Sequence, residues 1–276
     1  RHILGVEPSF GIEVISRENW IGRRLLADRF RDRRAFICGD AAHIWAPFAG
    51  YGMNAGIADA TNLAWMLAGV LKGWADPAVL AAHEAERWPI TEQVSKYAMG
   101  TALSLARARA GVPADIEAVG ERGDAVRVAL GSRLLEMHTP QFCCGGLNFG
   151  SFYDRSPIVA YDGEPAPTYT MDTFTPSTVP GCRTPHVWME DGRSLYDALG
   201  LDFTLLRFDR SIDVAGLVEA AALRGVPLSV LDLAAQAPYR QKLVLSRPDQ
   251  HVAWRGDLLP SDALSLIDRI RGAPVA

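Results

Sequence analysis

The stretch RAFICGDAAHIWAPFAGYGMN, residues 34–54, contains the strongest structural signal in the chain. An apolar, β-prone run over residues 35–38 ends at a Gly-Asp pair, which predicts a strand with the carboxylate of Asp40 at its end. The loop that follows contains Pro47, Gly50 and Gly52, and a helical pattern begins after it. Glycines let the backbone approach a ligand closely, helix N–H groups point at electron-rich oxygens, and a carboxylate can accept hydrogen bonds from ribose or ribityl hydroxyls. The stretch therefore predicts one side of a site for a nucleotide-type ligand.

The composition is that of a globular protein. The chain has 276 residues, about half of them hydrophobic, and a net charge of −4, which allows one large or two ordinary domains. The mild net negative charge does not indicate binding to nucleic acid or to an anionic membrane. No apolar run approaches the ~18 residues of a transmembrane helix. The four cysteines show neither a disulfide-framework spacing nor a C-x-x-C pair, so we expect a reduced, cytoplasmic setting.

A helix with one buried face is expected over residues 53–71, because apolar residues recur there at i, i+3 and i+4. The residues on that face are Ala60, Leu63, Ala64, Leu67, Ala68 and Leu71. Asp59, Asn62 and Met66 fall on other faces. Gly73 stands where the helix should end.

Further helices are expected downstream. Asp76-Pro77 is an N-cap and N1 pair for a second helix, which Pro89 should kink or end. Residues 91–110 and 114–136 also read as helical. The charged residues Glu84, Glu86 and Arg87 of the second helix are interpreted as a solvated or paired face.

The ends of the chain differ in character. Residues 10–16 suit an edge strand, residues 21–31 suit either a strand or a short helix, and residues 32–34 form a charged turn. Because strand-like sequence follows soon after Arg1, we expect the chain to continue a longer protein. Residues 139–185 are rich in glycine and proline and form either a linker or a loop-rich segment clamped on a neighbour.

Regular structure is expected again after residue 185. The strands are expected at 186–189, 203–208, 228–233, 242–246 and 251–254, and the helices at 195–199, at 214–223 and after a Ser261 cap. The order β-α-β-α-β-β-β-α predicts a small thioredoxin-like α/β domain.

Three motifs lie close together: GDAAH at 39–43, GYGMN at 50–54 and DATNLAW at 59–65. With Pro47 they resemble the FAD-dependent aromatic hydroxylases (single-component flavoprotein monooxygenases), and within them the phenol hydroxylase and 3-hydroxyphenylpropionate hydroxylase branch. The stretch from 180 to 256 is similar to the C-terminal thioredoxin-like domain of the same proteins.

The resemblance implies an α/β fold in which a partial, Rossmann-like FAD-binding domain with long helices precedes a thioredoxin-like domain without C-x-x-C. Residues 1–31 would end a substrate-sheet (middle) domain, and residues 32–150 would form the C-terminal part of the FAD-binding domain. Residues 151–184 would be an irregular linker and residues 185–276 the thioredoxin-like domain, which would serve packing or oligomer contacts such as those of a homodimer.

The resemblance also implies which residues contact the cofactor. Asp40 would bind the ribityl or ribose hydroxyls of FAD, and Pro47 would lie beside the isoalloxazine. The backbone N–H groups at the pyrimidine end of the flavin would come from Gly50, Gly52, Met53 and Asn54. There the helix dipole would favour the negative charge of reduced flavin.

Some family features are replaced and others are missing. Ala46, Tyr51 and Met66 stand where the family usually has Pro, Gln and Lys, and the bulk of Tyr51 and Trp45 is expected to reshape the flavin-side pocket. The family's G-x-G-x-x-G unit does not occur in this sequence. The resemblance also places the family's later D-G pair, which contacts the FAD pyrophosphate, outside this chain. We therefore expect half of an FAD site here, with a missing N-terminal half of the enzyme as its partner and little FAD binding or activity by this chain alone.

Several reactive residue types are given structural interpretations. His43 follows a strand and is expected to be structural, while Trp65 and Met66 are expected to pack in the core. Cys143-Cys144 lacks histidines at ligand spacing, so inert thiols and no metal site are expected. Arg183 and His186 are expected to anchor the third domain against the flavin domain, and no acid or base is assigned from this sequence.

The function implied by the resemblance is that of an FAD- and NAD(P)H-dependent monooxygenase. It would react with O2 through a flavin C4a-hydroperoxide and hydroxylate a phenolic or other aromatic substrate. Two alternatives stay open: another flavin oxidoreductase on the same scaffold, and a non-catalytic, thioredoxin-like assembly module.

Overall fold

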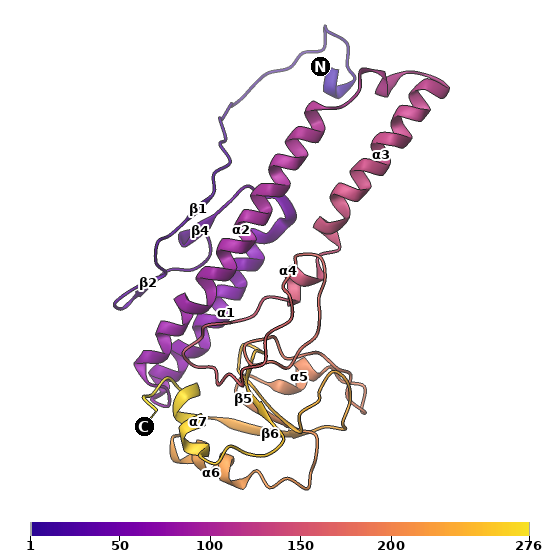
Figure 1. Cartoon of the computed structure of the whole chain (residues 1–276). Coiled ribbons are helices and arrows are strands. Elements are labelled where there is room, and N and C mark those ends of the chain that lie inside the picture. Colours follow the sequence, from indigo (N-terminus) through magenta and orange to yellow (C-terminus); the bar gives the residue numbers. More distant parts are fainter. Residues whose placement is uncertain (1, 276) are drawn as a thin grey trace.

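The computed structural model describes residues 2–275. Two long helices dominate its first half: α1 (Tyr51–Lys72) and α2 (Ala81–Ala110), joined by the 3-10 helix η4 (Pro77–Leu80) (Figure 1). Gly73 ends α1 in the left-handed conformation (φ 82°), and the Asp76 side chain caps η4 by accepting the Ala78 N–H at 2.8 Å, both as predicted. α2 continues through Pro89, so that proline does not end the helix.

The buried face of α1 differs from the predicted one. Leu71 is 86% exposed, and Ala60 and Ala64 are exposed as well. The residues that α1 buries are Tyr51, Ala55, Asp59, Asn62, Leu63, Trp65, Met66 and Gly69. The prediction was wrong because it placed polar side chains outward, whereas Asp59 and Asn62 are buried with charged partners on α2. Trp65 and Met66 do pack in the core, as expected.

Short strands precede α1 and lie along α2 (Figure 1). β1 (Leu25–Leu26) pairs with β4 (His43–Ile44), and β2 (Arg31–Asp32) pairs with β3 (Ala35–Phe36), each antiparallel. The 3-10 helices η1 (His2–Leu4), η2 (Gly39–Ala41) and η3 (Phe48–Gly50) lie in the same part of the chain. The predicted strand at 35–38 is thus two residues long, and the charged turn at 32–34 is confirmed. Residues 10–16 were wrongly predicted as a strand, for they are irregular and exposed in the described structure.

Contacts from α2 hold these short strands in place. Glu84 accepts the backbone N–H groups of Phe30 and Arg31 at 2.6 and 3.2 Å. The Trp88 indole N–H donates to the Ala27 carbonyl at 3.0 Å. Each strand pairs over only two residues, so these side-chain hydrogen bonds from α2 help to hold the strands in position.

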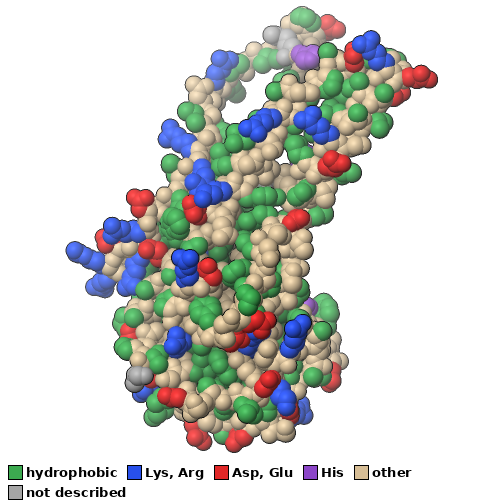
Figure 2. All heavy atoms as spheres, viewed as in Figure 1, with side chains coloured by type: hydrophobic (Ala, Val, Ile, Leu, Met, Phe, Trp, Pro, Cys, Tyr) green, Lys and Arg blue, Asp and Glu red, His purple; other side chains and the backbone are tan. Residues whose placement is uncertain are grey.

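Beyond α2 the chain forms η5 (Ala114–Glu117), α3 (Glu121–Phe142) and α4 (Gly145–Phe149). The helix predicted at 114–136 is confirmed, although its main part begins and ends later. α3 runs beside the outer part of α2 and projects away from the rest of the molecule, and hydrophobic side chains are visible between the long helices in Figure 2.

The irregular segment over residues 150–194 is packed against its neighbours. Tyr153 and Ile158 are buried, the Tyr153 N–H bonds to the Gly181 carbonyl, and the Ala160 N–H bonds to the Ala253 carbonyl at 2.9 Å. Of the two alternatives, the clamped, loop-rich segment describes it better than a free linker.

The last part of the chain is a four-stranded sheet with helices, which we call the C-terminal unit. Its elements are α5 (Leu195–Leu199), β5 (Phe203–Arg207), α6 (Ala215–Leu223), β6 (Leu228–Asp232), β7 (Leu243–Ser246), β8 (Val252–Gly256) and α7 (Ala263–Ile270). The strand order is β6-β5-β7-β8, with β5 and β6 parallel and the other pairs antiparallel. This matches the predicted order except at its start.

Two details of that prediction were wrong. Residues 186–189 form a single bridge, Trp188 to Ser194, and no strand in the described chain, because a turn at 190–192 lies on one side of the pair and α5 begins directly after Ser194 on the other. The cap of α7 is Asp262, whose carboxylate accepts the Ser265 N–H at 2.9 Å, and not Ser261.

One hydrophobic core joins the long helices to the C-terminal unit. The Trp65 and Trp74 rings lie parallel with centroids 6.3 Å apart, and the Phe203 ring meets both edge-on at 5.6 and 6.1 Å. Since Phe203 begins β5 and Trp65 lies in the C-terminal part of α1, that end of α1 packs directly on the sheet.

Candidate functional site

The Gly39-Asp40 turn lies directly against α1. A Cβ built on Gly56 would be 3.2 Å from the Gly39 Cα, and Gly39 has φ +56°. Both positions therefore favour glycine, one for the close approach and the other for its conformation. The contact brings Asp40, which is exposed on η2, beside the first turns of α1.

The residues predicted to bind a cofactor gather along this edge. Asp40, Pro47, Gly50, Met53 and Asn54 are exposed, and Gly52 is half-buried. They belong to η2, the loop before η3, the end of η3 and the first turn of α1.

The N-terminus of α1 is open. Gly50, its N-cap, has φ +67° and makes no side-chain cap bond to the helix. A Cβ built on Gly50 or Gly52 would meet no described atom within 4 Å. Asn54 fixes the turn by donating its Nδ2 hydrogen to the Gly50 carbonyl at 3.2 Å. N–H groups in the first turn of an α-helix lack partners within that helix, so a start of this kind can present donors to an electron-rich ligand atom.

A buried carboxylate holds the turn from behind. Asp59, which is 0% exposed, accepts the Gly39 N–H at 3.1 Å, contacts the His43 Nε2 at 2.6 Å and accepts the Arg87 Nε–H at 2.9 Å. Burial opposes ionisation, but the bonds from His43 and the Arg87 guanidinium hold the pKa of Asp59 below its usual value. The structural interpretation of His43 fits this position, with its ring stacked on Trp45 at 4.9 Å.

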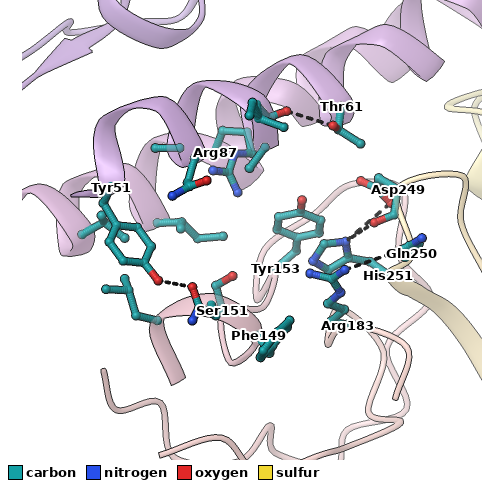
Figure 3. Close-up of a pocket in the computed structure, with 18 of the residues that line it drawn as sticks. Tyr51, Thr61, Arg87, Phe149, Ser151, Tyr153, Arg183, Asp249, Gln250 and His251 are labelled. Atoms are coloured by element: carbon teal, nitrogen blue, oxygen red, sulfur yellow. Dashed lines mark hydrogen bonds and ion pairs between the residues drawn. The ribbon is translucent and has the colours of Figure 1, made fainter. Parts of the chain in front are cut away.

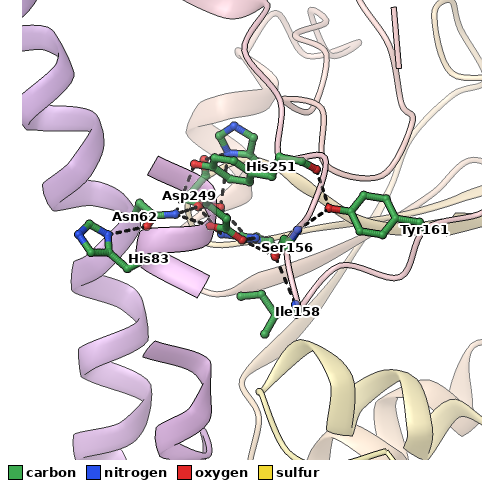
Figure 4. Close-up of polar contacts among 10 residues, drawn as sticks. Asn62, His83, Ser156, Ile158, Tyr161, Asp249 and His251 are labelled. Atoms are coloured by element: carbon green, nitrogen blue, oxygen red, sulfur yellow. Dashed lines mark hydrogen bonds and ion pairs between the residues drawn. The ribbon is translucent and has the colours of Figure 1, made fainter. Parts of the chain in front are cut away.

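A second buried cluster joins α1 and α2 to the C-terminal unit (Figure 4). The Arg247 Nη1 and Nη2 donate to both Glu86 oxygens at 2.6 and 2.8 Å, and its Nε and Nη2 donate to Asp249 at 3.0 and 2.6 Å. The Asn62 Nδ2 donates to Glu86 at 2.6 Å. Burial opposes the charge on Arg247, but Asp249 and Glu86 raise its pKa above the usual value.

Of the two interpretations of this face of α2, solvated or paired, the structure supports the paired one for Glu86 and Arg87. Glu86 and Arg87 are 2% and 5% exposed, and each is paired with a residue from another element. Such burial is tolerated because every charge has a charged partner and further hydrogen bonds.

A cavity of about 440 Å³ adjoins the first turns of α1 (Figure 3). α1 contributes Tyr51, Asn54, Ala58 and Thr61, and α2 contributes Arg87, Ile90 and Val94. The opposite wall includes Phe149, Tyr153, Arg183 and His251. Of the predicted cofactor residues, Asn54 alone is among those lining this cavity.

Tyr51 is buried against α2 and α4. Its hydroxyl donates to Asn148, and it packs with Ile90, Val94 and Leu147. Arg183 lies over the rings of Phe149 and Tyr196 and donates to the Gln250 side chain at 2.9 Å.

Sequence reasoning missed the buried charges that support the site. Asp59 belongs to the DATNLAW motif, and its place in that motif was the available signal. Arg247 and Asp249 lie in the β7–β8 turn, and the Arg247–Glu86 pair spans 161 residues, which a sequence pattern does not reveal.

Neither a metal site nor a membrane span emerges from residues 2–275. No cluster of three His, Cys, Asp or Glu side chains among them could hold a metal ion. None of their helices combines the length and apolarity needed to cross a bilayer.

Two family models match the chain. Residues 4–98 match the FAD binding domain, and residues 177–274 match the C-terminal region of aromatic-ring hydroxylases. The FAD-dependent monooxygenase apdD of Emericella nidulans is 37% identical over 90% of this chain and 42% of its own length. Phenol 2-monooxygenase of Pseudomonas sp. is 29% identical over 99% of this chain and 50% of its own length.

Solved structures agree with these matches. The rebeccamycin biosynthetic enzyme RebC with reduced flavin has a TM-score of 0.86 and 38% identity, over 96% of this chain and 50% of that one. Aklavinone-11 hydroxylase in a ternary complex with FAD and aklavinone has a TM-score of 0.64 and 28% identity, over 91% of this chain and 46% of that one. The chain spans about half the length of the relatives that it matches.

Proposed function

Because this chain belongs to the FAD-dependent aromatic-ring hydroxylase family, we propose that it forms the isoalloxazine and ribityl side of the FAD site in an aromatic monooxygenase. The observation that carries the proposal is the open N-terminus of α1, with the Gly39-Asp40 turn held beside it by Asp59. The edge offers backbone donors and an exposed carboxylate within one short stretch of surface.

The residues present fit such a cofactor. Asp40 would accept hydrogen bonds from ribityl or ribose hydroxyls, and Pro47 would lie beside the isoalloxazine ring. The N–H groups of Gly50, Gly52 and Met53 would face the pyrimidine end, where the uncapped helix favours negative charge. Asn54 would support them by holding the Gly50 carbonyl.

Bound FAD would supply the oxygen-activating chemistry after reduction by NAD(P)H. The part of this chain would be to orient the ring system and to favour its reduced, anionic form by the helix dipole. We propose a phenolic or larger aromatic substrate, because the similar proteins include phenol 2-monooxygenase and aklavinone-11 hydroxylase.

The exposed apolar face of α1 supports a further part of the proposal. Met53, Ile57 and Leu71 are exposed along the helix by 56% or more. We propose that the remainder of the FAD-binding domain, with its pyrophosphate-binding unit, covers this face. FAD would then be retained by the complete gene product and not by this chain alone.

The test measures flavin released on denaturation from the complete gene product and from its Asp40→Ala variant. Loss of hydrogen bonds to a charged group should weaken FAD binding by roughly 10- to 100-fold. Asp202→Ala is the matched control, since Asp202 is also an exposed aspartate but lies in the C-terminal unit. Unchanged FAD affinity in Asp40→Ala would overturn the assignment. Hydrogen peroxide formation without a hydroxylated product from phenolic substrates would overturn the hydroxylase activity.

A further inference from the structure

Two neighbouring residues of α2 bind opposite partners. Glu86 pairs with Arg247 of the β7–β8 turn, and Arg87 pairs with Asp59 of α1. Asp59 in turn accepts the Gly39 N–H. Successive residues of a helix project about 100° apart, so α2 can contact the C-terminal unit through Glu86 and α1 through Arg87. Two buried ion pairs on successive residues of α2 thus lie between Arg247 and the Gly39-Asp40 turn.

A second series of contacts runs in parallel. Asp249 accepts from the Asn62 Nδ2 at 3.3 Å, and the Asn62 Oδ1 lies 3.0 Å from the His83 Nδ1. The His83 Nε2 lies 3.4 Å from the carbonyl of Ile37, two residues before Gly39. Both routes begin at Arg247 and Asp249, which are ion-paired with each other, and both end at the same short stretch.

We propose that Arg247 is a positioning residue for the Gly39-Asp40 turn. The C-terminal unit then has a role beyond packing, since it fixes the turn that presents Asp40 through Glu86, Arg87 and Asp59. The link from this turn to a cofactor rests on the proposed function, whereas the mechanical coupling does not.

The coupling follows from charge balance in a buried site. Arg247 lies between the rings of Trp65 and Tyr153, at 5.1 and 5.0 Å, and is fully buried. Removing its charge leaves Glu86 and Asp249 without their cation in a low-dielectric site. Arg87, beside Glu86, is then the nearest buried cation on α2, and its attraction to those carboxylates competes with its bond to Asp59. The hydrogen bond from the Gly39 N–H to Asp59 would then weaken.

The direct test is hydrogen exchange of the Gly39 amide in this 276-residue chain, wild type against Arg247→Met. If Arg247 is coupled to the Gly39-Asp40 turn, the Gly39 amide should exchange roughly 2- to 30-fold faster in Arg247→Met than in wild type, under conditions where both proteins are folded. Arg224→Met is the matched control, because Arg224 makes a bidentate pair with Asp268 inside the C-terminal unit at 2.9 Å. The control should leave the Gly39 rate unchanged after correction for global stability.

Two further variants keep the test decisive. Adding Glu86→Gln to Arg247→Met removes one unpaired carboxylate and should return the Gly39 rate toward that of wild type. Arg247→Lys retains the charge and loses the bidentate geometry, so it should fold where Arg247→Met does not and show a smaller increase. An unchanged Gly39 rate in a folded Arg247→Met or Arg247→Lys protein overturns the proposal.

Cofactor retention separates this inference from the proposed function. In the complete gene product, Arg247→Met should lower FAD affinity in proportion to the increase in Gly39 exchange. A faster Gly39 exchange with unchanged FAD affinity would support the coupling and overturn the assignment of this turn to the cofactor.

Discussion

Arg247 and Glu86 lie 161 residues apart in sequence, and their fully buried side chains form a two-point ion pair with N–O distances of 2.6 and 2.8 Å. The pair joins the β7–β8 turn to α2 beside the shared aromatic core of Trp65, Trp74 and Phe203. The long helices and the C-terminal unit are therefore connected by both apolar and ionic contacts.

Breaking this pair should strongly destabilise the chain. Arg247→Met leaves Glu86 and Asp249 as uncompensated buried charges, so we expect the free energy of unfolding to fall by about 3–5 kcal/mol. Urea denaturation followed by tryptophan fluorescence measures it. Arg122→Met, which breaks the exposed Arg122–Asp115 pair, should change stability by no more than about 0.5 kcal/mol. Similar effects from the two variants would contradict the expectation.

The observed orientation of α1 predicts a contrast between two of its residues. Met66 is fully buried in the core, so Met66→Ala should cost about 2–5 kcal/mol. Leu71 is 86% exposed, so Leu71→Ala should stay within about 0.5 kcal/mol of wild type in this chain. Thermal or urea unfolding of both variants checks the contrast. A larger loss of stability from Leu71→Ala than from Met66→Ala would instead support the buried face that the sequence pattern predicted.

His83 should make the chain less stable in mild acid. Burial disfavours its charged form and lowers its pKa from 6.5, although the Ile37 carbonyl and Asp59 act in the opposite direction. Below pH 6.5 the unfolded chain therefore binds more protons than the folded chain. As the pH falls from 6.5 toward the lowered pKa, His83 should reduce the free energy of unfolding by up to about 1.4 kcal/mol per pH unit. Above pH 6.5 its contribution is constant.

The measurement is urea unfolding between pH 5 and 8 for wild type and His83→Gln. The variant should lack the part of the acid slope that His83 causes, while carboxylates such as Asp59, with a lowered pKa, titrate in more acidic solution in both proteins. Identical slopes would show that His83 is not held neutral.

The cysteines should differ in reactivity. Cys143 is exposed, whereas Cys182 is buried and burial raises its pKa to about 11. Iodoacetamide at about pH 8 should therefore alkylate Cys143 well before Cys182, because the thiolate is the reactive form. Peptide mass spectrometry of the native chain measures the order, and labelling in denaturant serves as the control. Equal labelling of the two residues in the native chain would refute the burial of Cys182.

Local signals allowed much of the fold to be predicted. Gly73 and Asp76 mark helix ends through backbone conformation and capping, which depend on neighbouring residues, and both predictions were confirmed. The strands of the C-terminal unit were predicted because their apolar runs are short and bounded by turns. The strand at 186–189 was not confirmed, since pairing depends on a partner that periodicity does not identify.

The predicted cofactor residues lie together because they are close in sequence. Residues 39–54 contain all of them, so one turn and one helix start suffice to assemble the edge. The supporting residues could not be predicted in the same way, since Asp59, Glu86 and Arg247 come from three elements distant along the chain.

The sequence by itself determined the turn at Gly39-Asp40, the open start of α1 and the family to which they belong, because each depends on residues within a few positions of one another. The tertiary structure alone decided which face of α1 is buried. Charged partners on α2 and the β7–β8 turn offset the cost of burying Asp59 and Asn62, so these two polar residues lie on the inner face of the helix together with apolar ones such as Trp65.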